Sequence, residues 1–436
     1  MTTARTATPS TARAINDRLA LNLLLEQGPL TATELRELTG LSRPTVSDLL
    51  ERLQRGGLVA QAGERGEQRR GPNARLYALV ASRAHIAAVD VRSVGVSLVV
   101  ADLAGRTLAT AEIPVGPWPD EAAAPAAGSA APVAGSAAPG PAAAAAPDPA
   151  FAAPGPAALA GPPGLAAQTV RTLLAVAREA GVEQLHTVAV GVPGLVDPAT
   201  GRLNNIGGLP AWHAELLAAL RDLPDTALIL ENEVNLAGIS EHRIGAARDR
   251  DTFVLLWLGH GVGACVVLDG RLRRGASGGT GEIGFLPVPG TGGLPSSSGC
   301  EGGFHALVGS RAVCALARDH GLPADPADDA PAAEAVVQAA IAAGRAGEAF
   351  LDEFAGRVAV GVAALCVVLD PGCVVLGGEV GRAGGAELAG RVGRRLAEIS
   401  PLRTEVRAGL VGGGAVLGGA VLTAGDAARR ELFGGP

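Results

Sequence analysis

The sequence has no lysine, few cysteines and no apolar run long enough to cross a membrane. All 36 basic residues are arginine, and because alanine, glycine and proline are also abundant, we interpret this as coding bias. No two cysteines form a Cys-x-x-Cys pair, and three of the five lie in apolar runs, which predicts buried thiols in a reducing, cytoplasmic environment. We expect no signal peptide, because Asp17 and Arg18 precede the first short apolar run and Asn22 interrupts it. The five cysteines are Cys265, Cys300, Cys314, Cys366 and Cys373.

Composition and charge indicate a globular chain that contacts a polyanion at one end. The 436 residues leave room for two or three domains, and 48% apolar with 18% charged residues is ordinary for a protein with a core. The net charge is −7, but residues 1–83 contain 12 Arg and 8 acidic residues, so this part carries +4 and the remainder −11. Such asymmetry indicates contact with nucleic acid by the N-terminal part.

The N-terminal part begins with two predicted helices. Residues 1–13 are rich in Thr, Ala and Arg, and we expect a disordered tail. Ala14–Gln27 carries apolar residues at helical spacing. Thr31, with a glutamate three residues later, has the capping-box pattern of a second helix whose core face is Leu35 and Leu38.

A third helix and a basic hairpin complete the pattern of a winged helix–turn–helix. The third helix follows a glycine-containing turn, and its N-terminal end would reach base edges in the major groove. Leu58–Gln61 and Leu76–Val80 are predicted strands joined by a glycine-punctuated basic loop, typical of a wing. The alternative is a small helical domain with a solvated arginine loop. The predicted DNA contacts are Ser42, Arg43, Thr45, Ser47, Arg52, Arg65, Arg69, Arg70 and Arg75.

The most informative stretch, Thr252–Val288, has the pattern of a backbone cradle. Phe253–Leu258 and Ala264–Leu268 are apolar runs typical of strands, and Asp269–Gly270 is a hairpin signal. Between the two runs, we expect the glycines of Gly259–Gly263 to adopt positive φ and to let a ligand approach the backbone. A second glycine-rich loop follows. These features predict a site for a small polar ligand, and the alternative is a β-rich core with ordinary turns.

The same stretch resembles the ROK family of sugar kinases and sugar-responsive transcriptional repressors. The resemblance is carried by the glycine spacing, the Asp269–Gly270 turn and Gly281-Glu282-Ile283-Gly284, and it extends from about Ile86 to the C-terminus, minus one insertion. It implies an α/β fold with a two-lobed, actin-like ATPase-type domain that holds a sugar in its cleft. The N-terminal residues resemble the winged-helix domain of ROK repressors, which the stand-alone kinases of the family lack.

We therefore expect four parts. Residues 1–13 form the disordered tail and residues 14–83 the winged helix–turn–helix domain. Residues 84–116 and 164–436 form the actin-like ligand-binding domain. Residues 117–163 are Ala, Pro, Gly and Ser with almost no large apolar groups, and we expect a disordered insertion because they cannot bury enough surface to fold.

Several positions depart from the kinase pattern that the resemblance implies. ROK kinases carry an Asp, two Gly and a Thr in a first phosphate loop, whereas this chain has Asp90-Val91-Arg92-Ser93-Val94. Larger side chains obstruct the close backbone approach that a phosphate needs. Gly208 replaces a sugar-contacting Asn, Glu233 the general-base Asp, and Phe285 a His. The zinc motif keeps only Cys300, so we predict no metal site.

The resemblance implies that carboxylate and amide groups line the ligand site. Glu233 is one methylene longer than the general base, and a shift of about 1 Å can cost on the order of 10²-fold in rate, so we predict no catalytic residue and no cofactor. Glu379, beside a glycine pair near the nucleotide or the lobe hinge, would repel phosphate or face solvent. An alternative interpretation of Asn232 and Glu233 is that they form a helix N-terminus with acidic caps. The predicted ligand contacts are Asn232, Glu233, Glu282 and Glu301.

These observations lead to three hypotheses. The first is a transcriptional regulator, a repressor of carbohydrate-related genes, that binds double-stranded operator DNA and a sugar or sugar-derivative effector as a homodimer or a dimer of dimers. Its two recognition helices would lie about one DNA turn apart. The effector would favour one of two arrangements of the lobes or of the subunits. The second is a sugar kinase with an added DNA-binding domain. The third is a DNA-binding protein whose ligand pocket is vestigial. None of them has a membrane partner.

Overall fold

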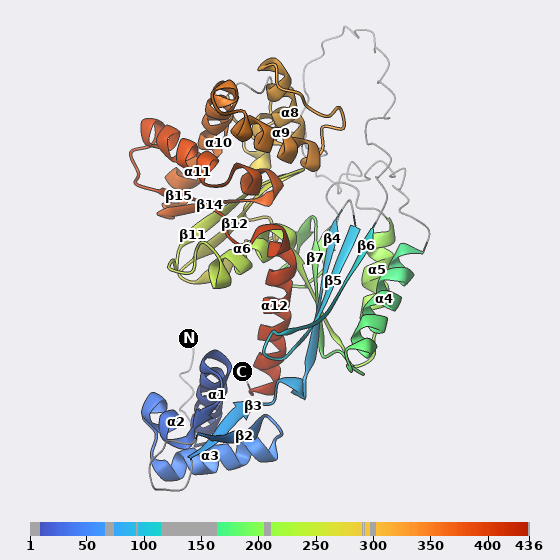
Figure 1. Ribbon diagram of the computed structural model, residues 1–436, viewed down its shortest axis with the longest axis vertical. Coiled ribbons are helices and arrows are strands. Elements are labelled where there is room, and N and C mark those ends of the chain that lie inside the picture. The colour runs from blue at the N-terminus through green and yellow to red at the C-terminus, as the bar shows by residue number, and fades with distance from the viewer. Residues whose placement is uncertain are drawn as a thin grey trace, which may run out of the picture.

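The computed structural model describes residues 9–65, 74–92, 95–114, 164–204, 211–289, 291, 293–296 and 302–434. A small N-terminal domain and two α/β lobes follow one another along the longest axis of the molecule (Figure 1). Each lobe contains a five-stranded sheet. This architecture confirms the predicted fold class, a winged helix–turn–helix joined to a two-lobed α/β domain. The predicted insertion at residues 117–163 lies outside the described residues.

The N-terminal domain combines three helices with a small antiparallel sheet. The helices are α1 (Pro9–Gln27), α2 (Ala32–Thr39) and α3 (Arg43–Arg55). The strands are β1 (Leu30–Thr31), β2 (Val59–Arg65) and β3 (Ala74–Leu79), in the order β1-β3-β2. Apolar side chains from all three helices meet in the interior, which explains why they form one unit. Its buried residues include Leu21, Leu24, Leu35, Val46, Leu49, Leu50 and Leu53.

The capping box predicted at the start of α2 is present. Thr31 N–H donates to Glu34 Oε2 at 2.8 Å, and Glu34 N–H donates to Thr31 Oγ1 at 3.2 Å. At the other end, Gly40 has φ 70° and its N–H bonds to Arg36 O. A left-handed residue here favours glycine and turns the chain into α3.

Two details of this domain differ from the prediction. α1 begins at Pro9, so residues 9–13 are helical instead of disordered, and the alanine and arginine there are good helix formers. Leu38 is 47% exposed, whereas Leu35 is buried. Apolar spacing indicates a shared helix face, but it does not show how much of a short helix the neighbouring elements cover.

Lobe 1 is built on a sheet of order β10-β7-β4-β5-β6. Strands β4 (His85–Arg92), β7 (Thr187–Val192) and β10 (Ala227–Asn232) run parallel, and β5 (Gly95–Asp102) and β6 (Thr107–Pro114) pair antiparallel. The helices α4 (Leu165–Glu179) and α5 (Ala211–Arg221) cover one face, and α12 (Ala415–Leu432) covers the other (Figure 1). Coverage on both faces explains the nearly continuous apolar runs of the central strands. A short hairpin of β8 (Leu195–Val196) and β9 (Leu203–Asn204) follows β7.

Lobe 2 contains a second sheet, of order β13-β12-β11-β14-β15. Its strands are β11 (Phe253–Leu258), β12 (Val262–Leu268), β13 (Arg271–Arg273), β14 (Cys373–Gly377) and β15 (Glu405–Ala408). Its helices are α6 (Glu233–Ile244), α7 (His305–Val308), α8 (Ser310–Asp319), α9 (Ala330–Ala342), α10 (Glu348–Leu369) and α11 (Gly378–Ile399). The predicted Asp269–Gly270 hairpin is confirmed, with φ of 55° and 70° at these two residues.

Helices α6 and α12 pack against each other between the lobes. α6 lies on the lobe 2 sheet and α12 on the lobe 1 sheet. A Cβ added to Gly419 would collide with the carbonyl oxygen of Leu236, so this close approach requires glycine. One apolar cluster extends from Leu21 in the N-terminal domain to Phe433 after α12, so the N-terminal domain is packed onto lobe 1. Among the described helices, none combines the length and apolarity that a membrane crossing requires.

Candidate DNA interface and interlobe site

The N-terminal end of α3 presents polar side chains to solvent. Ser42 caps the helix: its Oγ accepts from Thr45 N–H at 3.4 Å and lies 2.8 Å from Thr45 Oγ1. Arg43, the first residue of α3, and Ser47, one turn later, are exposed. Hydroxyl and guanidinium groups at a helix N-terminus can donate to base edges and phosphates. The structure therefore groups four of the predicted DNA contacts on one helix end.

Arg52, another of the predicted DNA contacts, is paired with acidic residues in this structure. Its Nη2 lies 2.6 Å from Asp17 Oδ1 of α1, and the same guanidinium pairs with Asp48. The hydrogen bond that Arg52 donates to Asp17 raises the pKa of Arg52 above its usual range. Arg52 thus links α3 to α1, and its contact with DNA stays a prediction. Helical spacing places it off the core face, but the partner lies 35 residues away in sequence, where spacing gives no signal.

Strands β2 and β3 form the hairpin that the predicted wing requires. Their register pairs Arg65 with Ala74, so both strands extend further into the basic loop than predicted. A bulge between Gln61 and Gly63 bends the hairpin, and Gly63 has φ 119°. Arg75 is exposed on β3. The side chain of Arg65, and the whole of residues Arg69 and Arg70, lie outside the described residues.

Arg92 lies at the position where the ROK resemblance expects a phosphate loop. Its Nε donates to Asp90 Oδ2 at 2.6 Å, and its Nη2 donates to the carbonyl oxygen of Gly413 at 2.8 Å. Gly413 belongs to a 3₁₀ turn, η6 (Gly412–Gly414), that leads into α12. Burial raises the pKa of Asp90, and the charge of Arg92 opposes this rise. A guanidinium with two acceptors therefore lies at the sequence position where the resemblance expects the phosphate loop.

Carboxylates gather around Arg92. Burial, together with the charges of Asp90 and Glu379, raises the pKa of Glu233 to about 8. Burial also raises the pKa of Glu282 and of Glu379. Glu379 lies in the first turn of α11, and its Oε2 is buried without a hydrogen-bond partner among the described residues. Groups that already resist ionisation make this an unfavourable place for a phosphate anion.

Asn232 joins this group as the N-cap of α6. Its Oδ1 accepts from the N–H groups of Val234 at 2.9 Å and Asn235 at 3.2 Å. Its Nδ2 donates to Gly194 O at 3.1 Å, so within the described part of the chain one amide hydrogen is left for a ligand. The charge of Glu282 acts on Glu233, so the structure brings three of the four predicted ligand residues together. Glu301 lies outside the described residues.

An ion pair that the sequence did not predict joins the two lobes beside these residues. Arg274, in the loop after β13, places Nη2 2.7 Å from Glu231 Oε2 at the end of β10. The buried Glu231 also accepts from Asn232 N–H at 3.0 Å and Asn235 Nδ2 at 2.9 Å. The sequence offered one signal for this ion pair, because Glu231 is an acidic residue that ends an apolar strand directly before the predicted ligand residues.

The glycines of the predicted cradle act in two ways. None of those in Gly259–Gly263 has positive φ, so that expectation was wrong. Gly259 instead lies in close contact with Glu379, because a Cβ there would collide with Glu379 Oε2 unless that side chain moved. The following loop does use left-handed backbone, and a Cβ on its last glycine would collide with Ala264 O. The positive-φ residues of that loop are Gly275, Gly278 and Gly281.

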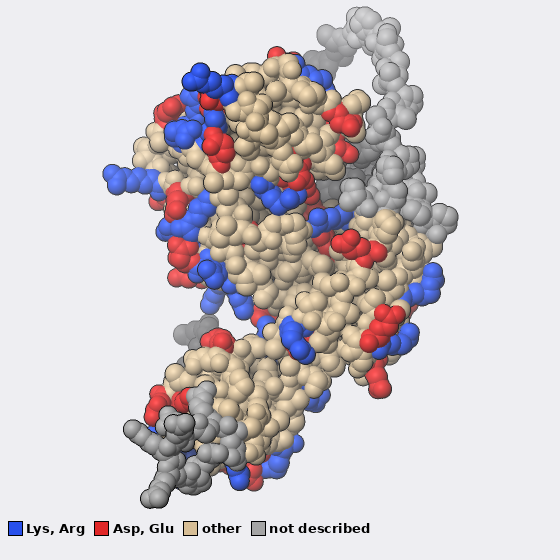
Figure 2. Space-filling model, viewed as in Figure 1, with Lys and Arg blue, Asp and Glu red and all other residues tan. Residues whose placement is uncertain are grey.

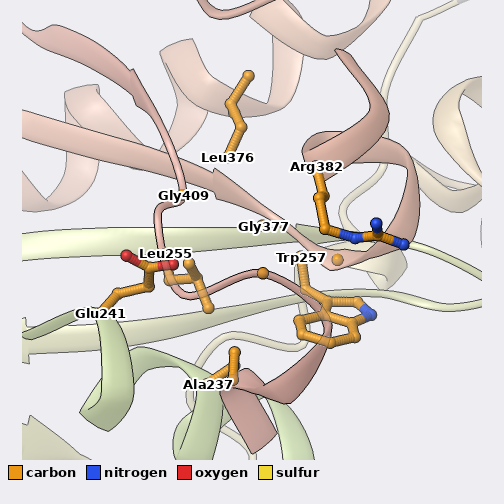
Figure 3. Close-up of a pocket in the computed structure, with 11 residues that line it drawn as sticks. Ala237, Glu241, Leu255, Trp257, Leu376, Gly377, Arg382 and Gly409 are labelled. Atoms are coloured by element: carbon orange, nitrogen blue, oxygen red, sulfur yellow. The ribbon is translucent and has the colours of Figure 1, made fainter. Parts of the chain in front are cut away.

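A small cavity lies where the chain crosses between the lobes (Figure 3). Its volume is about 20 Å³, room for about one water molecule. Pockets for drug-sized ligands have volumes of about 300–1,000 Å³, so this cavity is far smaller than such a pocket. The glycine pair that the resemblance places near a nucleotide or hinge, Gly377–Gly378, lines this cavity together with Trp257 and Gly409.

Glu241 fixes the loop beside this cavity. Its carboxylate is buried in α6 and accepts three backbone hydrogen bonds, two of them from the loop between β15 and α12. This loop is the second point at which the chain crosses between the lobes, the first being the β10–α6 junction. The donors are the N–H groups of Ala246 at 2.7 Å, Leu410 at 3.1 Å and Val411 at 2.9 Å.

Comparison with known families agrees with this geometry. A model described as "ROK family" matches residues 163–423. The chain belongs to the ROK family. A model described as "MarR family" matches residues 15–71, which covers the winged-helix domain. The family resemblance expected from the glycine motifs is therefore confirmed, and this ROK chain carries a MarR-type domain at its N-terminus.

Curated relatives of this ROK chain include a regulator and an enzyme. The DNA-binding transcriptional dual regulator NagC of Escherichia coli (strain K12) is 28% identical over 107 residues, which are 24% of this chain and 26% of NagC. The bifunctional enzyme NanE/NanK of Brucella melitensis is 35% identical over 154 residues, 35% of this chain and 27% of the enzyme. The chain thus spans about a quarter of the length of these two relatives.

A solved structure matches nearly the whole chain. It is a ROK family transcriptional regulator described as a homologue of the Escherichia coli MLC protein, with a TM-score of 0.70 and 17% sequence identity. The match covers 97% of this chain and 98% of that one. At this identity the likeness shows the fold, and the fold includes the N-terminal domain as well as both lobes.

Proposed function

We propose that this protein is a DNA-binding transcriptional regulator, a repressor of carbohydrate-related genes, whose two lobes bind a sugar or sugar-derivative effector. The observation that carries the proposal is the winged-helix domain packed onto a ROK domain, with the polar end of α3 open to solvent. The similarity to NagC supports the same reading. Such a regulator acts in the cytoplasm, on double-stranded operator DNA.

The regulator would bind DNA as a homodimer or a dimer of dimers. A helix–turn–helix places one recognition helix in one major groove, and a two-fold pair reads two half-sites about one helical turn apart. The operator is then an inverted repeat. Arg43 and Ser47 would contact base edges, and Arg75 on the wing would contact phosphate.

Three observations support a domain without sugar kinase activity. The Arg92 guanidinium bonds to Asp90 and to Gly413 O where phosphate would approach. Carboxyl groups with raised pKa surround it. The cavity at the glycine pair has a volume of about 20 Å³. Phosphoryl transfer works by positioning phosphates and their metal ions, and in the described part of the chain Arg92 and the small cavity argue against such positioning.

Selection of genomic DNA fragments by the purified full-length protein tests the proposal. The salt concentration is fixed at a moderate value, because phosphate contacts make affinity salt-dependent. We expect enrichment of one inverted-repeat sequence, near genes of carbohydrate metabolism. An Arg43→Ala variant run in parallel should give weaker enrichment and a relaxed preference at one position of the half-site. Recovery of fragments no richer in any sequence than the starting pool would overturn the proposal.

A sugar kinase with an added DNA-binding domain is the second candidate, because relatives of this chain include enzymes. Release of ADP from ATP–Mg²⁺ in the presence of a hexose panel decides between the two, and turnover with any hexose would contradict a domain without kinase activity. A vestigial ligand pocket is the third possibility. Calorimetric titration with sugars and sugar phosphates tests it, and heats at the level of buffer dilution throughout would favour it.

A further inference from the structure

Helix α12 connects the interlobe junction to the DNA-binding domain. It runs along lobe 1, and its C-terminal end lies beside the N-terminal domain (Figure 1). Its 18 residues span about 27 Å at 1.5 Å per residue. The η6 turn before it holds the contact with Arg92, and Phe433 after it is buried in the apolar cluster shared with the N-terminal domain. One rigid element therefore touches both proposed sites.

The η6 turn at the start of α12 is held by Arg92, which lies among the predicted ligand residues. Arg92 holds Gly413 O at 2.8 Å and Asp90 at 2.6 Å. The charges of Glu379 and Glu233 act on the same guanidinium. A ligand that displaces Arg92 would therefore break its contact with η6.

Helices α12 and α6 pack so closely that neither can shift toward the other. The contact of Gly419 with Leu236 O leaves no space for a single methyl group. A Cβ on Gly418 would lie 2.9 Å from Ser240 Oγ, one turn further along α6. α6 begins with Asn232 as its cap, so both helices start at the candidate ligand site and must move together or slide along their glycine contact.

At the other end, a chain of hydrogen bonds leads from α12 to the link with the DNA-binding domain. Arg429 Nη1 donates to Leu103 O at 2.8 Å, and Leu103 N–H donates to Ala81 O at 3.0 Å. Ala81 opens a 3₁₀ turn, η1 (Ala81–Arg83), between β3 of the winged-helix domain and β4 of lobe 1. Arg429 is itself held by Asp426 Oδ1 at 2.6 Å. The side chain of Leu103 is fully buried.

We propose that α12 couples the interlobe site to the DNA-binding domain, with the Arg92–Gly413 contact as its input and the Arg429–Leu103–Ala81 chain as its output. The inference rests on the proposed function, in which one domain binds DNA and the lobes bind an effector. An effector that prefers one position of α12 then changes DNA affinity, and by reciprocity DNA changes the state of the interlobe site.

Hydrogen exchange of the full-length protein with sheared genomic DNA at low salt tests this reciprocity. Slower exchange of α3 amides reports DNA binding itself. Coupling adds a second response, a change in the exchange of the loop Gly409–Gly414, at the far end of α12. Arg429→Ala should keep the first response and lose the second. Arg430→Ala, which removes the same charge from the exposed neighbouring position, should behave as the wild type.

A comparison without DNA tests the input end. Arg92→Ala should accelerate exchange both at η6 and at η1, whereas Arg357→Ala, which removes an arginine paired with Glu353 within α10, should leave η1 unchanged. Arg429→Lys replaces Arg429→Ala where the alanine variant does not fold. Acceleration confined to η6, or a distal response to DNA that persists in both Arg429 variants, would overturn the coupling. Absence of α3 protection in the wild type would overturn the DNA-binding proposal, and the comparison without DNA would still decide the coupling.

Discussion

At the scale of single residues, two arginines of α3 show why residue type alone does not define a DNA contact. Arg43 opens the helix and is exposed. Arg52, nine positions later, is neutralised by Asp17 and Asp48. Both residues point away from the core in the sequence pattern. Only the fold, which brings α1 against α3, distinguishes a guanidinium open to DNA from one that holds the domain together.

Arg43→Ala should weaken specific DNA binding by ~1–3 kcal/mol and relax base preference at one position of the half-site. The reason is the loss of a bidentate donor at the helix end that enters the groove. Fluorescence anisotropy of the full-length protein on the selected fragment measures the effect at fixed salt. Arg55→Ala, at the exposed opposite end of α3, is the matched control and should not change base preference. Equal affinities for wild type and Arg43→Ala would remove α3 from the interface.

Glu233 should make the protein less stable as the pH rises. Its pKa is about 8 in the folded chain against an ordinary value of 4.5, so between these values the folded state binds a proton that the unfolded state has lost. The free energy of unfolding therefore falls from about pH 5 to about pH 8. Glu233→Gln removes this dependence and should gain on the order of 2 kcal/mol over wild type across that range.

Urea unfolding of both proteins at several pH values measures the difference. The control is Glu179→Gln, an exposed glutamate at the end of α4, which should leave the pH dependence as in the wild type. Wild-type and Glu233→Gln curves that run parallel across this range would mean that the Glu233 carboxyl is ionised in the folded protein.

At the scale of elements, the α6–α12 contact depends on a glycine. Gly419→Ala would force a methyl group against Leu236 O, and overpacking of this kind costs about 1–3 kcal/mol or more. Gly390→Ala, in α11, is the matched control, because the nearest atom to its added Cβ is 3.7 Å away. That variant should be more stable by about 0.5–1 kcal/mol, since alanine loses less entropy in a helix. Thermal unfolding compares the two, and a stable Gly419→Ala protein would mean that the helices separate freely.

Local signals predicted the elements well, and long-range contacts escaped prediction. The Thr31 capping box and the Asp269–Gly270 hairpin involve residues within four positions of each other, so the sequence contains all of the information needed. The Arg274–Glu231 pair spans 43 positions and two lobes. The pattern predicted Gly259 to be a positive-φ turn glycine, yet its close neighbour is Glu379, from a helix far along the chain. Spacing patterns do not contain such partners, which the tertiary fold alone brings together.

At the scale of the whole molecule, the DNA-binding domain and the lobes differ in net charge. Residues 1–83 carry +4, and the rest of the chain carries −11. On the face shown in Figure 2, basic and acidic side chains alternate over the lobes, without a large patch of one sign. The lobes therefore offer DNA no broad attractive surface there, and we expect phosphate contacts to come from α3 and the wing.

The salt dependence of DNA affinity tests whether the phosphate contacts come from α3 and the wing. The logarithm of DNA affinity should fall linearly with the logarithm of salt concentration, with a slope of about −0.9 per phosphate neutralised. Arg75→Ala on β3 removes one proposed phosphate contact per protomer, so the slope should become shallower by about 1 per half-site. Arg178→Ala removes the same charge from an exposed site on α4 of lobe 1 and should leave the slope unchanged. If both variants shifted the slope equally, net charge rather than local contact would govern binding, and the wing would have no place in the interface.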